Sequence, residues 1–263
     1  MPSPFKLATW NVNSVRARLE HLRIWLQDHS PDVICLQETK VVDEDFPQEE
    51  IASMGYQSLF AGQKSYNGVA ILAKHPIEDP WIGLDGENGD EQKRLVAGTI
   101  HGMRVVNVYV PQGSEVDSPK FAYKLSFLEE LAAMLKRDFS VDQPLALVGD
   151  INIAPAAKDV VDAEAMANQV SFHPLEHEAL RRIMDLGFDD LYRRFSQDGG
   201  QYSWWDYRQG SFRQNKGMRI DLLLVTEKLA SIAIDCWMDR EVRAKEKPSD
   251  HIPVVGEFAW PVD

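Results

Sequence analysis

The chain has 263 residues, of which 44% are hydrophobic and 26% are charged, as in an ordinary globular protein. A net charge of −13 argues against non-specific coating of nucleic acid, but a local patch of the surface can still bind phosphates. No apolar run approaches the roughly 18 residues of a membrane span, and no secretory signal is visible, so we expect no membrane contact and a cytoplasmic location.

The first third of the chain alternates predicted strands with a helix. Ser14 is the predicted N-cap of that helix, and Pro31 follows its end. We expect the cysteines, Cys35 and Cys236, to be buried free thiols because both lie in apolar segments, although the sequence leaves a disulfide open. Strands are predicted over residues 5–10, 32–38, 55–61 and 67–73.

The middle of the chain begins with a glycine-rich, acidic segment over 79–91, which predicts a surface loop. Two strands, 94–100 and 103–110, then form a hairpin that turns at His101 and Gly102. Pro119 begins an amphipathic helix. Its predicted buried stripe consists of Phe121, Leu125, Leu128, Ala132 and Leu135.

The last part of the chain contains a helix over 175–186 that Gly187 ends, followed by three more strands. These strands are predicted over 219–225, 232–238 and 254–258. Most strands lack polar alternation, so both of their faces should be covered by other elements. No linker-like tract or repeat interrupts the sequence, which favours a single domain over residues 1–263.

The stretch 145–152 is a short apolar strand that ends in a carboxylate and an amide. If the chain stays extended after Gly149, the side chains of Asp150 and Asn152 point to the same side. Burying them costs free energy unless a cation or a phosphate compensates. For this stretch alone, a simple Asp/Asn turn is the favoured interpretation.

Polar residues recur, however, at the ends of most predicted strands. They are Asn11, Glu38, Tyr109, Asp150, Asn152, Asp221, Asp250 and His251. Turn propensity explains Asn and Asp but not Glu38. Asp221 stands inside an apolar run between Ile220 and Leu222, so its carboxylate needs a cation or a donor such as a histidine.

These residue types suit hydrolysis of a phosphoester with an oxygen-preferring metal such as Mg²⁺. Zn²⁺ is less favoured because His75 and His101 are isolated in the sequence. His173 and His177, four residues apart, fit a solvated helix face better than a metal pair. No nucleophile elbow supports a serine or cysteine mechanism. The residues alone therefore indicate a metal-dependent hydrolase.

Eight segments resemble exonuclease III, the bacterial abasic-site endonuclease branch of the endonuclease/exonuclease/phosphatase superfamily. They are 10–18, 36–40, 67–71, 107–113, 148–155, 202–208, 218–224 and 247–251. They occur in the family's order and span nearly the whole chain. The resemblance implies an α/β fold, a four-layer αββα sandwich in which two mixed β-sheets pack face to face between helices.

The same resemblance implies a Mg²⁺-dependent DNA repair nuclease of base excision repair, with Mn²⁺ as a substitute metal. It would cut 5′ to abasic sites and act as a 3′–5′ exonuclease and 3′-end-cleaning phosphodiesterase or phosphatase. Its partner would be double-stranded DNA with abasic sites, nicks or blocked 3′ ends. The protein is expected to be a monomer that acts on the bacterial nucleoid.

The resemblance also implies a metal site. Glu38 would be the principal Mg²⁺ ligand, with Asn13 nearby and Asp250 contributing. Asp150 would orient or deprotonate the attacking water, and Asn11 would hold Asp150 in place.

Further implied roles concern the reacting phosphate. Asn152 would stabilise the phosphate, and Tyr109 would donate a hydrogen bond to it or to the leaving group. His251, oriented by Asp221, would neutralise charge that develops on the phosphoryl oxygens.

Substrate binding is implied at four positions. Lys40, Arg94 and Gln112 correspond to residues near the DNA backbone, and Trp204 corresponds to the aromatic residue that lines the pocket for an abasic sugar. Of Trp204 and Trp205, we expect one in the pocket and one in the core.

The sequence departs from the family pattern at Asn13, where some relatives carry Asp, and at Ser14, which replaces a usual Gly. The family's Phe-x-Pro-Glu-Glu-Arg run reads here Phe172-His-Pro-Leu-Glu-His177. Two alternatives stay open: a superfamily phosphatase or phosphodiesterase on a non-DNA phosphoester, and a DNA-end-binding module without turnover. A binding module has no need of a water-activating carboxylate, which argues against the second.

Overall fold

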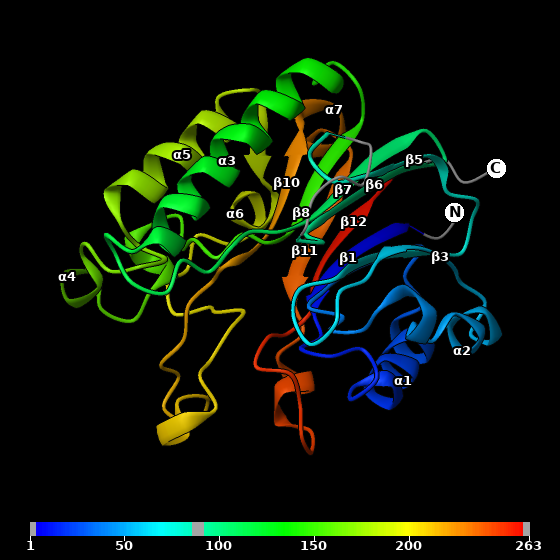
Figure 1. The fold of residues 1–263 in the computed structure, drawn as a ribbon, viewed down its shortest axis with the longest axis horizontal. Helices are drawn as coiled ribbons and strands as arrows, with labels where there is room; N and C mark the ends of the chain where they lie inside the picture. The colour runs from blue at the N-terminus through cyan, green and yellow to red at the C-terminus, as the bar shows by residue number, and fades with distance from the viewer. Residues whose placement is uncertain (1–3, 86–91, 260–263) are drawn as a thin grey trace.

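Two six-stranded sheets pack face to face, with helices on both outer faces (Figure 1). The computed structural model describes residues 4–85 and 92–259. The first sheet has the order β11-β12-β1-β2-β4-β3, and the second has the order β5-β6-β7-β8-β10-β9. Each sheet is mixed because β1 and β2 run parallel, as do β7 and β8, whereas the other neighbours are antiparallel. The expected αββα sandwich is confirmed.

The strands of the two sheets have the following bounds. The first sheet contains β1 (Phe5–Asn11), β2 (Val33–Gln37), β3 (Gln57–Ala61), β4 (Val69–Ala73), β11 (Ala233–Met238) and β12 (Val254–Phe258). The second sheet contains β5 (Glu78–Ile82), β6 (Leu95–Ile100), β7 (Met103–Tyr109), β8 (Leu145–Asp150), β9 (Phe188–Asp190) and β10 (Asp221–Thr226).

The longer helices form the outer layers. In Figure 1, α1 (Leu19–His29) and α2 (Gln48–Ser53) lie outside the first sheet, and α3 (Pro119–Asp138) and α5 (Pro174–Met184) lie side by side outside the second. The short helices are α4 (Ala163–Met166), α6 (Leu191–Phe195), α7 (Glu227–Ala230), η1 (Asp43–Asp45), η2 (Ala157–Asp159), η3 (Arg208–Gly210) and η4 (Arg240–Ala244). No helix in the described parts of the chain is long and apolar enough to cross a membrane.

Strand β8 illustrates why the sequence lacks polar alternation. Ala146 and Val148 face the other sheet, in the apolar cluster between the sheets, whereas Leu145 and Leu147 pack in the cluster beneath α3 and α5. Side chains alternate across a strand, so a strand with both faces covered needs apolar residues at every position. The buried thiols Cys35 and Cys236 are free, as expected.

The first helix begins later than its sequence predicts. Ser14 is not its N-cap, because α1 starts at Leu19 with Arg18 at the N-cap position. The backbone N–H groups of Ser14 and Val15 donate to the carbonyl groups of Glu38 and Thr39. These bonds tie the segment after β1 to the segment after β2, so the chain must turn before a helix can form.

The predicted loop over 79–91 was partly wrong, because its first residues belong to β5; residues 86–91 of that prediction lie outside the described part. Strand β5 is exposed at the sheet edge, where Pro80 removes no ladder bond from a neighbour, and this explains its polar sequence. The hairpin is confirmed, with His101 (φ 49°) and Gly102 (φ 77°) at its turn.

The buried face of α3 is rotated from the predicted stripe. Leu125 and Ala132 are only half-buried, whereas Lys124, Phe127 and Leu131 are buried. The helix therefore presents a charged lysine to the interior.

Candidate active site

The polar strand ends of both sheets meet at one end of the sandwich. In the first sheet Asn11 is paired with Gln37, the residue before Glu38. In the second sheet Asp150 is paired with Tyr109 on one side and with Asp221 on the other. Strand pairing therefore brings residues that are far apart in the sequence to the same edge.

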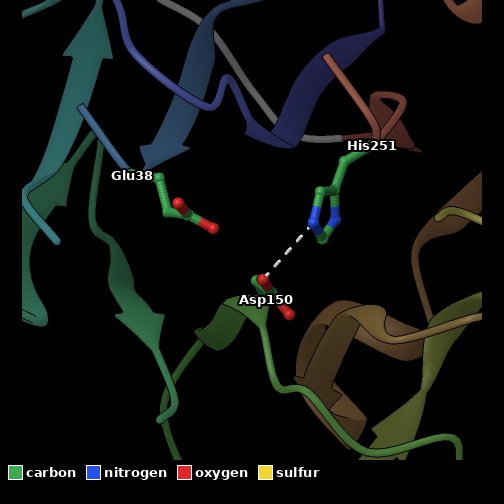
Figure 2. A group of neighbouring side chains, drawn as sticks. All are labelled: Glu38, Asp150 and His251. Atoms are coloured by element: carbon green, nitrogen blue, oxygen red, sulfur yellow. Dashed lines mark ion pairs between the residues drawn. The ribbon is translucent and has the colours of Figure 1, made fainter. Parts of the chain in front are cut away.

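Three of these side chains converge on one another (Figure 2). The ligand atoms of Glu38, Asp150 and His251 all lie within 4.8 Å of one another. Glu38 follows β2, Asp150 ends β8, and His251 lies just before β12. His251 Nε2 is 3.7 Å from Asp150 Oδ2. Two carboxylates this close to each other offer oxygen ligands for a divalent cation.

The Asp150 carboxylate is held from two sides. Asn11 Nδ2 donates to Asp150 Oδ2 at 2.9 Å and to Glu38 Oε1 at 2.8 Å, so one amide joins the two acids. The Asn152 backbone N–H donates to Asp150 Oδ1 at 3.0 Å. Burial raises the pKa of Asp150 to about 7 even though the charge of His251 opposes the rise. A carboxylate whose pKa lies near neutral pH can accept a proton at that pH.

The imidazole of His251 is fixed by a buried acid. Its Nδ1 lies 2.9 Å from Asp221 Oδ2, and the backbone N–H of Asp221 donates to Ser203 Oγ. Burial alone would lower the pKa of His251, but the carboxylates of Asp221 and Asp150 outweigh it and raise the pKa to about 10. The group is therefore an imidazolium at neutral pH, with Nε2 on the side of Asp150.

Glu38 is paired with the ammonium of Lys40. Lys40 Nζ lies 2.6 Å from Glu38 Oε2 and donates to Asn13 Oδ1, also at 2.6 Å. Burial would raise the pKa of Glu38, but Lys40 outweighs burial and holds it below its usual value. The carboxylate of Glu38 and the amide oxygen of Asn13 thus both contact one positively charged group. These donors therefore fit a hard, oxygen-preferring metal ion.

The Asp250 carboxylate accepts hydrogen bonds from two side chains outside the group of Glu38, Asp150 and His251. Its Oδ1 accepts from Asn13 Nδ2 at 2.9 Å, and its Oδ2 accepts from Trp204 Nε1 at 3.0 Å. Burial would raise the pKa of Asp250, but the charge of His251 and the hydrogen bonds from Asn13 and Trp204 together outweigh burial and lower the pKa. The structure thus links Asp250 to Asn13 but groups Asp150 and His251 with Glu38. A direct metal bond to Asp250 stays a prediction.

The phenol of Tyr109 faces the same acids. Burial raises its pKa well above the usual value, and the charges of Glu38 and Asp150 add to the rise. The guanidinium of Arg94 lies 4.7 Å from the Tyr109 ring centroid, and its Nη1 donates to the Tyr109 carbonyl at 3.2 Å. Tyr109 therefore stays neutral and can donate a hydrogen bond.

The backbone at Asn152 differs from the extended conformation that the sequence analysis considered. The chain does not stay extended, because Asn152 has a φ of 55°. Its Nδ2 donates to the Val110 carbonyl at 3.0 Å.

The side chain of Gln112 is exposed, and its Oε1 accepts from the Ser114 N–H at 2.7 Å.

The two tryptophans differ in burial, and the expectation that one of them lies in the core is confirmed for Trp205. Trp205 is fully buried, whereas Trp204 is half-buried and forms a β-bridge with His251. Trp204 packs with Ile220 and Met218 in a small apolar cluster. It also lines an apolar hollow of about 370 Å³, together with Val160 and Met166.

The histidine predictions need correction. His75 and His101 are not isolated, because their ring centroids lie 4.0 Å apart. His173 and His177 do not form a solvated face either: both are half-buried. His173 Nδ1 accepts from the N–H of Leu175 and caps α5, and His177 Nε2 is 2.9 Å from the Ala154 carbonyl.

Some residues of the site were missed from the sequence. Ser249 Oγ donates to the Asn11 carbonyl at 2.6 Å, and Arg18 donates to the carbonyl groups of Asn13 and Pro248. Both lie in segments that carry the family resemblance, but a side chain that bonds to backbone leaves no pattern. Lys124 had a visible signal, because it is a charged residue three positions from Phe121 on an apolar helix face.

The model of the endonuclease/exonuclease/phosphatase family matches residues 8–251. Exodeoxyribonuclease III of Haemophilus influenzae is 36% identical over 265 residues, which cover 96% of this chain and 99% of that protein. Among solved structures, the 3′ phosphatase NExo from Neisseria, bound to a product DNA hairpin, is 38% identical with a TM-score of 0.94.

An AP endonuclease from Archaeoglobus fulgidus is 39% identical with a TM-score of 0.93. The matches to both structures cover 97% of this chain and 100% of theirs. Sequence, fold and the three converging side chains agree. The chain belongs to the endonuclease/exonuclease/phosphatase family.

Proposed function

We propose that this protein is a metal-dependent DNA repair nuclease that cuts 5′ to abasic sites and also trims or cleans 3′ ends. The observation that carries the proposal is the meeting of Glu38, Asp150 and His251 at one edge of the two sheets. The similar proteins named above are an exodeoxyribonuclease, an AP endonuclease and a 3′ phosphatase with a DNA product, and these three activities share hydrolysis of a phosphoester at DNA.

The metal is Mg²⁺, with Mn²⁺ as a substitute. Glu38 is the principal ligand, and Asn13 and Asp250 complete its surroundings. The proposal is supported by the all-oxygen donors and by the Lys40 ammonium that bridges Glu38 and Asn13. When bound, the ion supplies positive charge to the phosphoryl oxygens.

Proton transfer is assigned to Asp150, which accepts the proton of the attacking water. Its carboxylate is aimed by Asn11 and by the N–H of Asn152, and its raised pKa matches neutral operation. The side chain of Asn152 contacts the phosphate.

Charge on the reacting phosphate is compensated by His251, whose Nε2–H points to the same space. Asp221 keeps His251 charged and oriented. Tyr109 donates a hydrogen bond to the phosphate or to the leaving oxygen.

DNA is held by Lys40, Arg94 and Gln112 along its backbone, while Trp204 lines the pocket for the abasic sugar. The segments that contain η3 and η4 project beyond the sheets at the same end of the molecule (Figure 1), which gives the site a rim for a duplex. The protein works as one domain over residues 1–263 and as a monomer in the cytoplasm.

A duplex with a single abasic site and a 5′ label tests the proposal. The purified protein with Mg²⁺ should cut on the 5′ side of the site, and a chelator should stop cleavage. A 3′-phosphate duplex and an undamaged duplex in parallel measure the other two activities. Hydrolysis of a small phosphoester together with an intact abasic duplex would overturn the proposal in favour of a non-DNA substrate.

A further inference from the structure

A lysine lies fully buried behind the active site. Lys124, on α3, exposes none of its surface. Its Nζ donates to the Asn152 carbonyl at 2.7 Å and to the Gln112 carbonyl at 3.2 Å, and it pairs with the carboxylate of Glu176. The ammonium therefore donates to two backbone carbonyl groups and is paired in charge with one carboxylate.

The stability of the fold does not by itself account for this pair. Lys124 occupies a helix face that otherwise buries Phe121, Phe127 and Leu128. Removing two charges from water costs several kcal/mol per ion, and apolar residues of similar size are often as stable as a buried ion pair. An apolar side chain would fill this position but would give no donor to the carbonyl groups of Asn152 and Gln112, so what the ammonium adds is its bond to these two groups.

The carbonyl groups that Lys124 contacts lie in the segments after β7 and β8. Tyr109 is the last residue of β7, and Asp150 is the last residue of β8. Both segments leave their sheet here, where strand pairing no longer fixes the backbone. Asn152 turns the chain with a φ of 55°. Its carbonyl is held by Lys124, and its N–H donates to Asp150 Oδ1 at 3.0 Å. A shift of this one residue would therefore turn the Asp150 carboxylate.

Glu176 anchors the other side of the ammonium. Its Oε2 accepts from the backbone N–H of His173 at 2.9 Å, which fixes the carboxylate at the first turn of α5. The carboxylate is fully buried as well. The ammonium thus joins two helices to the two segments that deliver the reacting side chains.

We propose that Lys124, paired with Glu176, is a positioning residue for phosphodiester hydrolysis. It holds the segments after β7 and β8 so that Asp150 is aimed at the attacking water. The inference rests on the proposed nuclease function. Misplacement of a base by a fraction of an ångström slows the chemical step more than it weakens DNA binding. Loss of Lys124 should therefore lower kcat and leave KM nearly unchanged.

The test replaces both charges at once with the double variant Lys124→Met/Glu176→Gln. The amide oxygen that Glu176→Gln introduces can still accept from the N–H of His173, and no unpaired charge is left in the interior. Lys136→Met is the matched control, because Lys136 is exposed on the same helix. Thermal unfolding measures stability, and steady-state incision of an abasic duplex, normalised to folded protein, gives kcat and KM.

We expect the double variant to stay folded at the assay temperature, with a melting temperature lowered by the loss of the bonds to the two carbonyl groups, kcat reduced at least tenfold and KM within threefold. The Lys136→Met control should match the wild type. A kcat within twofold of the wild type would overturn the inference, because a purely structural pair alters the amount of folded protein and not its turnover.

If the double variant does not fold, the single variant Lys124→Arg tests the inference in its place. Arginine keeps the positive charge opposite Glu176 but moves the hydrogen-bond donors, so the kcat of the folded protein should also fall at least tenfold. An unchanged kcat would overturn the inference equally. If the wild type itself does not cut the abasic duplex, the proposed function fails instead, so the two failures are distinguishable.

Discussion

Replacing Asp221 with Asn tests whether this acid acts through the charge of His251. Asp221 is fully buried, and its Oδ2 lies 2.9 Å from His251 Nδ1. Burial on its own lowers the pKa of His251, and the carboxylates of Asp221 and Asp150 raise it to about 10. Asp221→Asn leaves a hydrogen-bond acceptor but removes the charge, so the pKa should fall toward the ordinary value of about 6.5.

The size of the fall in kcat follows from the fraction of His251 that is protonated. At pH 8, an imidazole with a pKa of about 10 is almost entirely protonated, whereas one with a pKa of about 6.5 is only about 3% protonated. The kcat of Asp221→Asn should therefore fall by up to about 30-fold at pH 8 but by much less at pH 6. In the wild type, the raised pKa of His251 keeps the imidazolium present to high pH. In Asp221→Asn that pKa is lower, so the loss of activity on the alkaline side of the pH profile should begin at a lower pH.

The assay is incision of an abasic duplex by both proteins from pH 5.5 to pH 9.5. The ratio of the two rates at each pH cancels groups outside the Asp150–Asp221–His251 cluster that titrate in both proteins. Asp150 does not cancel, because the charge of Asp221 contributes to its pKa. Asp239→Asn is the matched control, because Asp239 also pairs with a histidine, His29 at 3.2 Å, away from the site. A rate ratio that is the same at pH 6 and pH 8 would refute this account of Asp221.

Two further predictions concern the charges around the phosphate. His251→Ala should cost roughly 3–4 kcal/mol of transition-state stabilisation, seen as a fall in kcat/KM, because the lost group stabilises developing charge; a fall of less than tenfold would contradict that role. Mg²⁺ should raise the melting temperature of the wild type, since a ligand that binds only the folded state stabilises it by about 2.7 kcal/mol at 100 times its Kd. Glu38→Gln should abolish that rise, and an equal rise in both proteins would remove Glu38 from the metal site.

The sequence predicted most of the strands along the chain and most of the polar strand ends, because apolar runs and turn residues are local signals. It missed β9, which has only three residues. It misplaced the start of α1, because the bonds from Ser14 and Val15 to the segment after β2 come from a distant part of the chain. It took β5 for a loop since an exposed edge strand carries polar residues like a loop.

In the site, the types of residue were predictable but their partners were not. A buried acid such as Asp221 needs a partner, and the sequence suggested a histidine, which proved to be His251. The Asn11 amide bonds to both Glu38 and Asp150. The sequence does not show this, because it depends on the pairing of β1 with β2 and on the packing of β1 against β8 of the other sheet. The turn at Asn152 and its bond to Lys124 also arise only when α3 packs over β8.

The measurement that tests the central claim most directly is single-turnover cleavage of an abasic duplex by Asp150→Asn with saturating Mg²⁺. Asn keeps the shape of the side chain and removes the carboxylate that accepts the proton of water. Binding to the same duplex is measured in parallel. We predict that cleavage is abolished while DNA affinity stays within a few-fold of the wild type. Cleavage by Asp150→Asn at a rate comparable to the wild type would contradict the account.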